Sequence, residues 1–144
     1  MLPVSEVAPT LRAELEDGTT IEGEHEIDTA TPGRSRIARF GTTVPVGAYP
    51  SALTALAEAD IIVLGPGDLY TSTLANMVVN GMKEAVVASK AKLVYIANLF
   101  SKCGQTEGMP VSACVTEVEK YAGRAPDVII INTGAVPEAA LSAY

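Results

Sequence analysis

The sequence predicts an α/β fold: a Rossmann-like, doubly wound, mainly parallel sheet with an N-terminal acidic β-hairpin. Three short and almost wholly apolar runs are typical of buried parallel strands, and they span Ile61–Leu64, Leu93–Ala97 and Val128–Ile131. Amphipathic helical patterns separate these runs, which favours βαβ crossovers. A chain of 144 residues is long enough to form one domain with its own apolar core.

The net charge of the chain lies entirely in its first segment. The chain carries 17 acidic and 10 basic residues, and residues 1–28 hold eight of the acids and only one base. We therefore predict two pieces, an acidic β-hairpin segment over 1–28 and a Rossmann-like α/β core over 29–144. Without a Lys/Arg cluster, a nucleic-acid surface or an anionic-membrane surface is disfavoured.

Composition narrows the compartment and the chemistry further. No apolar run approaches the roughly 20 residues of a membrane span, and no signal peptide is visible, so we expect a cytoplasmic protein. The two cysteines, Cys103 and Cys114, are expected to be reduced thiols. A single histidine, His25, disfavours a histidine-rich zinc site and a Ser-His-Asp triad.

The first elements are predicted from alternation and turn signals. Leu11, Ala13 and Leu15 alternate with polar residues, as in a half-buried strand, and Asp17-Gly18 is a hairpin turn signal. Three glutamates, at positions 22, 24 and 26, are expected on one face of the return strand. They form either a solvated face that discourages edge pairing or a surface that attracts a cation.

Further elements follow in chain order. Residues 29–35 are turn-forming, 36–44 predict another strand, and Pro50 suits the first turn of a helix. Two later helices are predicted from their apolar stripes. The first stripe comprises Met82, Ala85, Val86 and Ser89, and the second comprises Val111, Cys114, Val115, Val118 and Ala122.

Three loops follow the carboxyl ends of the predicted parallel strands, where ligands bind in open α/β sheets. They are Gly65–Ser72, Asn98–Pro110 and Asn132–Gly134.

In the first loop, Gly65, Pro66 and Gly67 allow a tight turn and a close backbone approach to a ligand. The predicted helix that follows would favour a phosphate at its N-terminus, with hydroxyls from Thr71 and Ser72. Asp68 would repel a phosphate unless a metal intervened, so a plain capped turn is the alternative.

In the other two loops, Asn98 and Asn132 each follow a strand and could either contact a ligand or brace their own loop. The remaining polar candidates are Lys102, Gln105, Thr106 and Glu107. Cys103 lies beside Lys102 and could be a thiol of lowered pKa. Cys114 lies on the apolar stripe and is expected in the core.

The combined motifs resemble the YvcK/CofD-like family over essentially the whole chain. They are GPGDLYTS at 65–72, the N-x5-G-x-T pattern of Asn98, Gly104 and Thr106, and N-x-G at 132–134. The family includes the bacterial gluconeogenesis factor and the 2-phospho-L-lactate transferases of deazaflavin coenzyme biosynthesis. The Leu-Tyr-Thr-Ser motif at 69–72 and the GE-x-E-I motif at 23–27 resemble the corresponding motifs of the gluconeogenesis-factor branch.

That branch implies a regulatory protein of carbon metabolism and cell shape that binds a nucleotide sugar of the UDP-sugar kind, without an established catalytic residue. The ligand-binding positions implied are Gly65, Pro66, Gly67, Asp68, Thr71, Ser72, Asn98, Thr106 and Asn132. The alternatives are a transferase in which Asp68 holds Mg²⁺ against a nucleotide diphosphate, and a non-catalytic module whose acidic hairpin docks a partner. A homodimer is compatible with all three.

The sequence also departs from the family pattern. Family chains open with a strand and a glycine-rich GGGTG-type loop, which has no counterpart here, and Gln105 stands where the family pattern has Glu. We therefore expect a central-to-C-terminal piece of a chain about twice as long.

Overall fold

The alternating residues near the start of the chain form the centre of an antiparallel sheet. The computed structural model describes residues 1–29 and 31–138. Its first sheet has the order β2-β1-β3, with β1 at Leu11–Leu15, β2 at Thr20–Glu22 and β3 at Ile37–Thr42. The three inward side chains of β1 are buried, as the alternation predicts.

The predicted return strand is wrong beyond Glu22. The chain turns at Gly23, whose φ of +101° favours glycine, and enters the short helix α1 (Glu24–Asp28). Ile27 is buried on this helix, while Arg34 donates hydrogen bonds to the carbonyls of Ile27 (2.7 Å) and Thr29 (2.6 Å). Burial of Ile27 and the hydrogen bonds from Arg34 therefore stabilise a short helix where the sequence predicts a strand with a row of glutamates.

The turn between β1 and β2 uses Gly18 alone for positive φ. Gly18 has φ +87°, and no described residue other than glycine has a positive φ. The carboxylate of Asp17 instead accepts the backbone N–H of Thr19 at 2.8 Å. The turn is thus stabilised by an Asp side chain rather than by two left-handed residues.

The strand β3 joins the two predicted segments. It pairs antiparallel with β1, so that Ala13 lies opposite Phe40 in the ladder. The boundary between 1–28 and 29–144 stays a prediction, but the first sheet takes strands from both sides of it.

The second sheet is parallel and has the order β4-β5-β6. Its strands β4 (Ile61–Leu64), β5 (Lys92–Ile96) and β6 (Val128–Ile130) match the three predicted apolar runs to within one residue. The predicted helices are present as α2 (Pro50–Glu58), α3 (Met82–Ala88) and α4 (Val111–Ala122). In the described part of the chain, none of the helices is long and apolar enough to cross a membrane.

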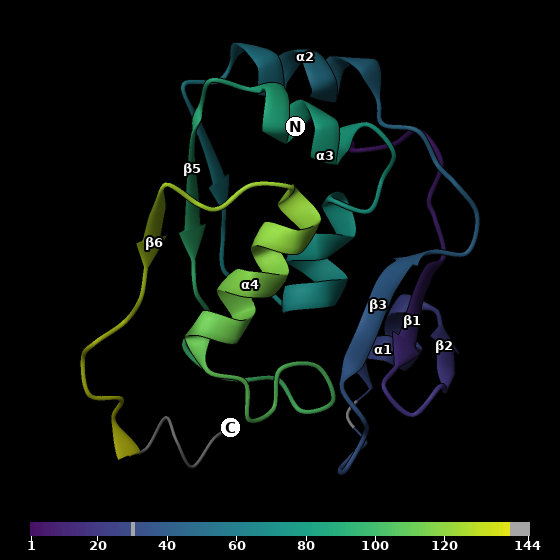
Figure 1. Ribbon diagram of the computed structural model, residues 1–144, viewed down its shortest axis with the longest axis vertical. Coiled ribbons are helices and arrows are strands. Elements are labelled where there is room, and N and C mark those ends of the chain that lie inside the picture. Colours follow the sequence, from purple (N-terminus) through teal and green to yellow (C-terminus); the bar gives the residue numbers. More distant parts are fainter. Residues whose placement is uncertain (30, 139–144) are drawn as a thin grey trace.

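Helices cover only one face of this sheet (Figure 1). Leu93 and Tyr95 of β5 are buried against them, whereas Ile61 and Val63 of β4 are 59% and 55% exposed. The expectation of strands buried on both faces is therefore wrong for the described residues. The strands follow one another in chain order across the sheet, and successive crossovers in one direction place their helices on the same face.

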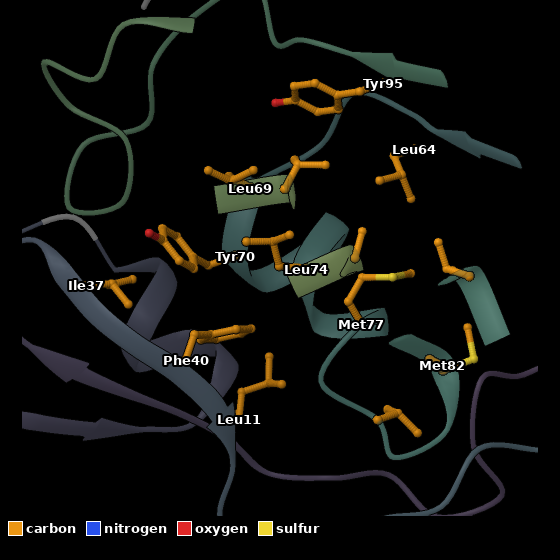
Figure 2. Packing of buried hydrophobic residues seen from close by; sticks show 14 of the residues in the cluster. Leu11, Ile37, Phe40, Leu64, Leu69, Tyr70, Leu74, Met77, Met82 and Tyr95 are labelled. Carbon is orange, nitrogen blue, oxygen red and sulfur yellow. The ribbon is translucent and has the colours of Figure 1, made fainter. Parts of the chain in front are cut away.

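One apolar core joins the two sheets (Figure 2). Phe40 of β3 meets Tyr70 edge-on, with 5.5 Å between ring centroids, and meets Tyr121 of α4 in the same way at 6.3 Å. The Tyr121 hydroxyl accepts the backbone N–H of Phe40 at 2.8 Å. These contacts fix the antiparallel sheet beside the loops that follow the parallel strands.

Candidate functional site

The loop after β4 leads into two short helical turns rather than a regular α-helix. Residues Leu69–Thr73 form a π-helical turn, η1, and Leu74–Asn76 form a 3₁₀ turn, η2. The backbone N–H groups of Ser72 and Thr73 both donate to the Asp68 carbonyl at 3.0 Å, and the Asp68 side chain makes no cap. The expected helix dipole is therefore weak here, because five residues sum few aligned peptide dipoles.

Asn98, which follows β5, holds the glycine loop through both ends of its amide. Its Oδ1 accepts the N–H of Gly67 at 3.0 Å, and its Nδ2 donates to the Gly67 carbonyl at 2.6 Å. The brace that the sequence left open is thus present, and the Gly67 N–H is already paired. Contact of Asn98 with a ligand stays a prediction.

Gln105 connects the glycine loop to the antiparallel sheet region. It is 4% exposed, and its Oε1 accepts the N–H of Tyr70 at 3.2 Å. Its Nε2 donates to Thr71 Oγ1 (3.2 Å) and to Asp28 Oδ1 (3.1 Å). One buried amide therefore joins the loop after β5, the loop after β4 and the end of α1.

Lys102 completes this cluster with two ion pairs. Its ammonium lies 2.9 Å from Asp28 Oδ1 and 3.2 Å from Asp68 Oδ2. Hydrogen bonding to the Lys102 ammonium lowers the pKa of Asp28. The two carboxylates, Asp28 first, raise the pKa of Lys102. Asp28 and Lys102 are therefore both charged near neutral pH.

The predicted hydroxyl groups differ in their availability. Thr71 is buried and bonded to Gln105, and Thr106 is buried with its Oγ1 accepting the Lys102 N–H at 2.8 Å. Ser72 is exposed, and its Cβ would lie 3.2 Å from a Cβ added at Gly67. Thr71 and Thr106 thus brace the loops, whereas Ser72 is open to solvent.

These loops enclose a cleft of about 310 Å³ beyond the carboxyl ends of β4 and β5. Its lining comprises Pro66, Gly67, Asp68, Asn98, Leu99, Phe100, Ser101 and Lys102. The polar part of the lining therefore comprises backbone groups, the Asn98 amide, the Ser101 hydroxyl, the Lys102 ammonium and the Asp68 carboxylate. A wider groove of about 530 Å³ lies between the segment 4–11 and the turns η1 and η2.

Asn132 does not join the other predicted residues. Among the described residues its amide bonds only to Gly134 of its own loop, at 3.0 and 3.2 Å, and it is exposed. Its strand β6 is separated from β4 by β5. The structure thus brings together the loops at 65–72 and 98–106 but leaves Asn132 apart from their cleft.

The alternative of a lowered-pKa thiol at Cys103 is wrong. The Cys103 thiol donates to Glu107 Oε2 at 3.4 Å, and this hydrogen bond raises its pKa. Lys102, the cation that was expected to lower it, points its charge at Asp28 and Asp68 instead. Cys114 packs against the core, and burial raises its pKa.

The donor set limits what metal this cleft can hold. No group of three or more His, Cys, Asp or Glu side chains lies close enough to hold a metal ion within residues 1–29 and 31–138. Asp68 and Asp28 are the two carboxylates present, and both face Lys102. Such a pair fits Mg²⁺ only together with the phosphates of a bound nucleotide, which is the usual way proteins hold that ion.

Comparison with known proteins identifies the family from which this arrangement derives. The family model described as 2-phospho-L-lactate transferase CofD matches residues 1–144. The chain belongs to the CofD family. The resemblance on which the sequence reading relied is therefore confirmed.

Members of the CofD family with similar sequences carry a different name. The "Putative gluconeogenesis factor" of Thermotoga maritima is 40% identical over 144 residues, which is all of this chain and 45% of that protein. The "Gluconeogenesis factor" of Listeria innocua is 35% identical over 139 residues, covering 96% of this chain and 42% of that protein. The chain thus spans less than half the length of the curated relatives it matches.

A crystal structure of a UPF0052 family member from Bacillus halodurans has the same fold. It superposes with a TM-score of 0.92 at 33% identity, and the match covers 99% of this chain and 46% of that one. The α/β arrangement described above is therefore shared with the matched part of that UPF0052 family member.

Sequence reasoning missed two parts of the site. Asp28 was only counted among the acids of residues 1–28, and Gln105 was treated only as one polar candidate among several. The departure from the family pattern at Gln105 was the available signal, because a buried amide has both a donor and an acceptor to place.

Proposed function

We propose that this chain contributes the diphosphate-binding part of a nucleotide-sugar site in a regulatory protein of the gluconeogenesis-factor type. The ligand is of the UDP-sugar kind, and the protein influences carbon metabolism and cell shape rather than turning over a substrate. In this proposal the parallel sheet is Rossmann-like, and the ligand lies beyond the carboxyl ends of its strands.

The cleft that Lys102 and the glycine loop line together carries this proposal. Lys102 is the cation of the cleft lining, and ammonium groups are common phosphate ligands. A diphosphate would compete with Asp28 and Asp68 for this ammonium, so binding exchanges two partly exposed ion pairs for phosphate contacts. Gly67 presents no side chain to the cleft, which permits close approach of a phosphate.

The volume of this cleft also supports a ligand site that is shared with polypeptide outside the matched region. Ligand pockets range over roughly 300–1,000 Å³, and this cleft of about 310 Å³ lies at the lower end. It suits a diphosphate with part of one attached group. The remaining groups of a nucleotide sugar would then contact polypeptide that the relatives carry outside the matched region.

The test uses UDP-glucose as the probe and thermal unfolding of the 144-residue chain as the readout. UDP-glucose should raise the midpoint, and Lys102→Gln should remove most of that rise. Lys90→Gln is the matched control, because Lys90 is exposed and makes no ion pair in the described residues. An equal rise in Lys102→Gln and in the unsubstituted chain, or no rise in either, would overturn the proposal.

Glycine variants test the loop itself. An added Cβ at Gly67 would press on the Ser72 Cβ at 3.2 Å, whereas one at Gly65 would meet no atom within 4 Å. Gly67→Ala should therefore weaken the response to UDP-glucose more than Gly65→Ala does. Equal responses of the two variants to UDP-glucose would count against a close approach of the phosphate to the Gly67 backbone.

A second candidate is a transferase of the phospholactate type, favoured by the description of the matching family model. Asp68, together with Asp28, would then hold Mg²⁺ at the nucleotide's phosphates. If this candidate is correct, the response to a nucleotide diphosphate should require Mg²⁺, and Asp68→Asn should abolish that Mg²⁺-dependent response. A response to UDP-glucose that is independent of Mg²⁺ favours the regulatory protein.

A further inference from the structure

A second cavity, of about 150 Å³, lies between the end of β5, the loop that follows this strand and the first turn of α4. The lining residues that decide its chemistry are Leu69, Tyr95, Thr106, Met109, Val111 and Cys114. Residues 98–101 line both this cavity and the cleft of Lys102, but neither Gly67 nor Lys102 belongs to its lining. The cavity is therefore a neighbour of the proposed diphosphate site and not a part of it.

Tyr95 brings an unpartnered hydroxyl group to this cavity. The residue is only 4% exposed, and its hydroxyl makes no hydrogen bond to any residue that the structure describes. Figure 2 shows this hydroxyl pointing away from Leu64. Burial, and secondarily the charge that Cys114 would carry when ionised, raises the pKa of Tyr95 to about 12, so the hydroxyl is a donor near neutral pH. Because buried polar groups are normally hydrogen-bonded, this donor indicates that the cavity receives an acceptor.

The first turn of α4 and the loop before it supply further donors. Pro110 precedes this helix of 12 residues without a side-chain cap, and the first turn contains no acidic residue. Within the described part of the chain, the N–H groups of Val111 and Ser112 have no acceptor. The buried Thr106 hydroxyl accepts the Lys102 N–H at 2.8 Å, which leaves its own proton available. Free N–H groups at the start of a helix favour an anion.

The rest of the lining limits this anion to a small one with an apolar body. Leu69, Met109 and Val111 give the cavity aliphatic walls, and no Lys, Arg, Asp or Glu of the described residues lines it. A phosphate usually requires such cations, whereas a carboxylate can use hydroxyl and N–H donors at one end while its alkyl chain packs on the walls. The volume equals that of about five water molecules in the liquid, which suits a short chain.

We propose that this cavity binds a short-chain aliphatic monocarboxylate. Its carboxylate accepts from the Tyr95 hydroxyl and the first turn of α4, and its alkyl chain contacts Leu69 and Met109. The proposal does not rest on the nucleotide-sugar function, because it uses donors outside the cleft of Lys102. A bound carboxylate would nevertheless contact residues 98–101, which also border that cleft.

Titration of the isotope-labelled chain with sodium butyrate tests the proposal, with sodium chloride at equal ionic strength as the reference. Backbone resonances of Thr106 and Val111 should shift with butyrate only. Tyr95→Phe should weaken butyrate binding by about tenfold or more, because it removes a hydrogen bond to a charged group. Tyr49→Phe is the matched control and should bind as the unsubstituted chain does, because the Tyr49 hydroxyl has no printed role in the cavity lining.

Two variants at Val111 separate charge from shape. Val111 is exposed enough to accept a polar side chain, and an aspartate in the first turn of a helix is favourable for folding. Val111→Asp should abolish butyrate binding, because the new carboxylate takes the free N–H groups and repels the ligand. Val111→Asn has nearly the same shape without the charge and should retain binding. Butyramide, the neutral analogue, should bind about tenfold more weakly than butyrate.

Three results would overturn the proposal. Equal affinity of Tyr95→Phe and the unsubstituted chain would exclude the hydroxyl as a ligand contact, and equal binding of butyramide would exclude a carboxylate site. Shifts with butyrate that do not exceed those with chloride would mean that the cavity holds only water. Lys102→Gln should leave butyrate binding unchanged, so a missing response to UDP-glucose would bear on the proposed function alone.

Discussion

Asn98 and Gly67 form a two-point hydrogen-bonded pair across 31 positions of sequence, with N–H to Oδ1 at 3.0 Å and Nδ2 to carbonyl at 2.6 Å. The pair ties the loop after β4 to the loop after β5. Because both main-chain groups of Gly67 are satisfied by one side chain, the shape of the proposed diphosphate loop depends on a single amide.

Asn98→Leu should destabilise the fold by about 1–3 kcal/mol, because it leaves the N–H and the carbonyl of Gly67 unpaired. Urea unfolding followed by circular dichroism measures the change. Asn132→Leu is the control, since the hydrogen bonds of Asn132 to residues that the structure describes all lie within its own exposed loop, and its effect should stay within about 0.5 kcal/mol. Equal effects of the two substitutions would show that the hydrogen bonds between Asn98 and Gly67 do not stabilise the fold.

Gln105→Glu should destabilise the chain by about 1–3 kcal/mol at neutral pH. The new carboxylate would lose the donor to Thr71 and would face the carboxylate of Asp28. Desolvation and the like charge should raise its pKa, so protonation at low pH should restore the donor and part of the stability. The measurement is urea unfolding from pH 4 to pH 8.

The double variant Gln105→Glu with Asp28→Asn serves as the control for that charge conflict. It should recover part of the loss at neutral pH, because an amide at position 28 can donate to the new carboxylate. If the loss is the same with and without Asp28→Asn, the two side chains do not interact.

The ion pairs of Lys102 should make the unsubstituted chain more stable to unfolding than Lys102→Met. That difference should disappear both at low pH and at high pH. Lys102→Met should cost about 0.5–1 kcal/mol near neutral pH, since the pairs are partly exposed. The folded pKa of Asp28 is below its ordinary 3.8, so its contribution is present above that value and is lost as pH falls through the folded pKa. The folded pKa of Lys102 is above its ordinary 10.5, so its contribution is full below that value and is lost as pH rises through the folded pKa.

Unfolding of the unsubstituted chain and of Lys102→Met across pH 2–11 measures this profile. The difference between them should be largest between the two limits and should shrink at both ends. Lys90→Met is the control, because Lys90 makes no ion pair among the described residues, and its effect on stability should not change with pH in this way. A difference that does not change with pH would mean that packing of the Lys102 alkyl chain, not its charge, stabilises the fold.

Tyr121→Phe should loosen the antiparallel sheet from α4. The substitution removes the acceptor of the Phe40 N–H and should cost about 1–2 kcal/mol. Tyr95→Phe is the matched control, because the Tyr95 hydroxyl carries no hydrogen bond within the described residues, and its loss should be near zero. Amide hydrogen exchange at Phe40 should accelerate in Tyr121→Phe alone, and equal exchange in both variants would contradict this coupling.

The sequence was most informative where structure depends on local pattern. The three apolar runs and the stripes of α3 and α4 each depend on periodicity within a few residues, and their bounds were predicted closely. Glu24–Asp28 was misread as a strand, because burial of Ile27 and the cap from Arg34 are tertiary effects that outweigh the alternation of glutamates.

The site was predicted in outline and not in its connections. The rule that ligands lie beyond parallel strand ends placed Gly67 and Asn98 together correctly. The bonds of Gln105 to Asp28 and Thr71 span 77 and 34 positions, and no spacing within one loop encodes them. Asn132 was grouped with Asn98 by analogy, but the position of β6 beyond β5 keeps it apart.

A titration of isotope-labelled protein with UDP-glucose, followed by backbone and side-chain amide resonances, tests the central claim most directly. We predict shifts at Gly65, Gly67, Ser72, Lys102 and the Asn98 side-chain amide, with Asn132 unchanged. Shifts confined to the groove at residues 4–11, or no shifts at millimolar UDP-glucose, would contradict a diphosphate site at the glycine loop.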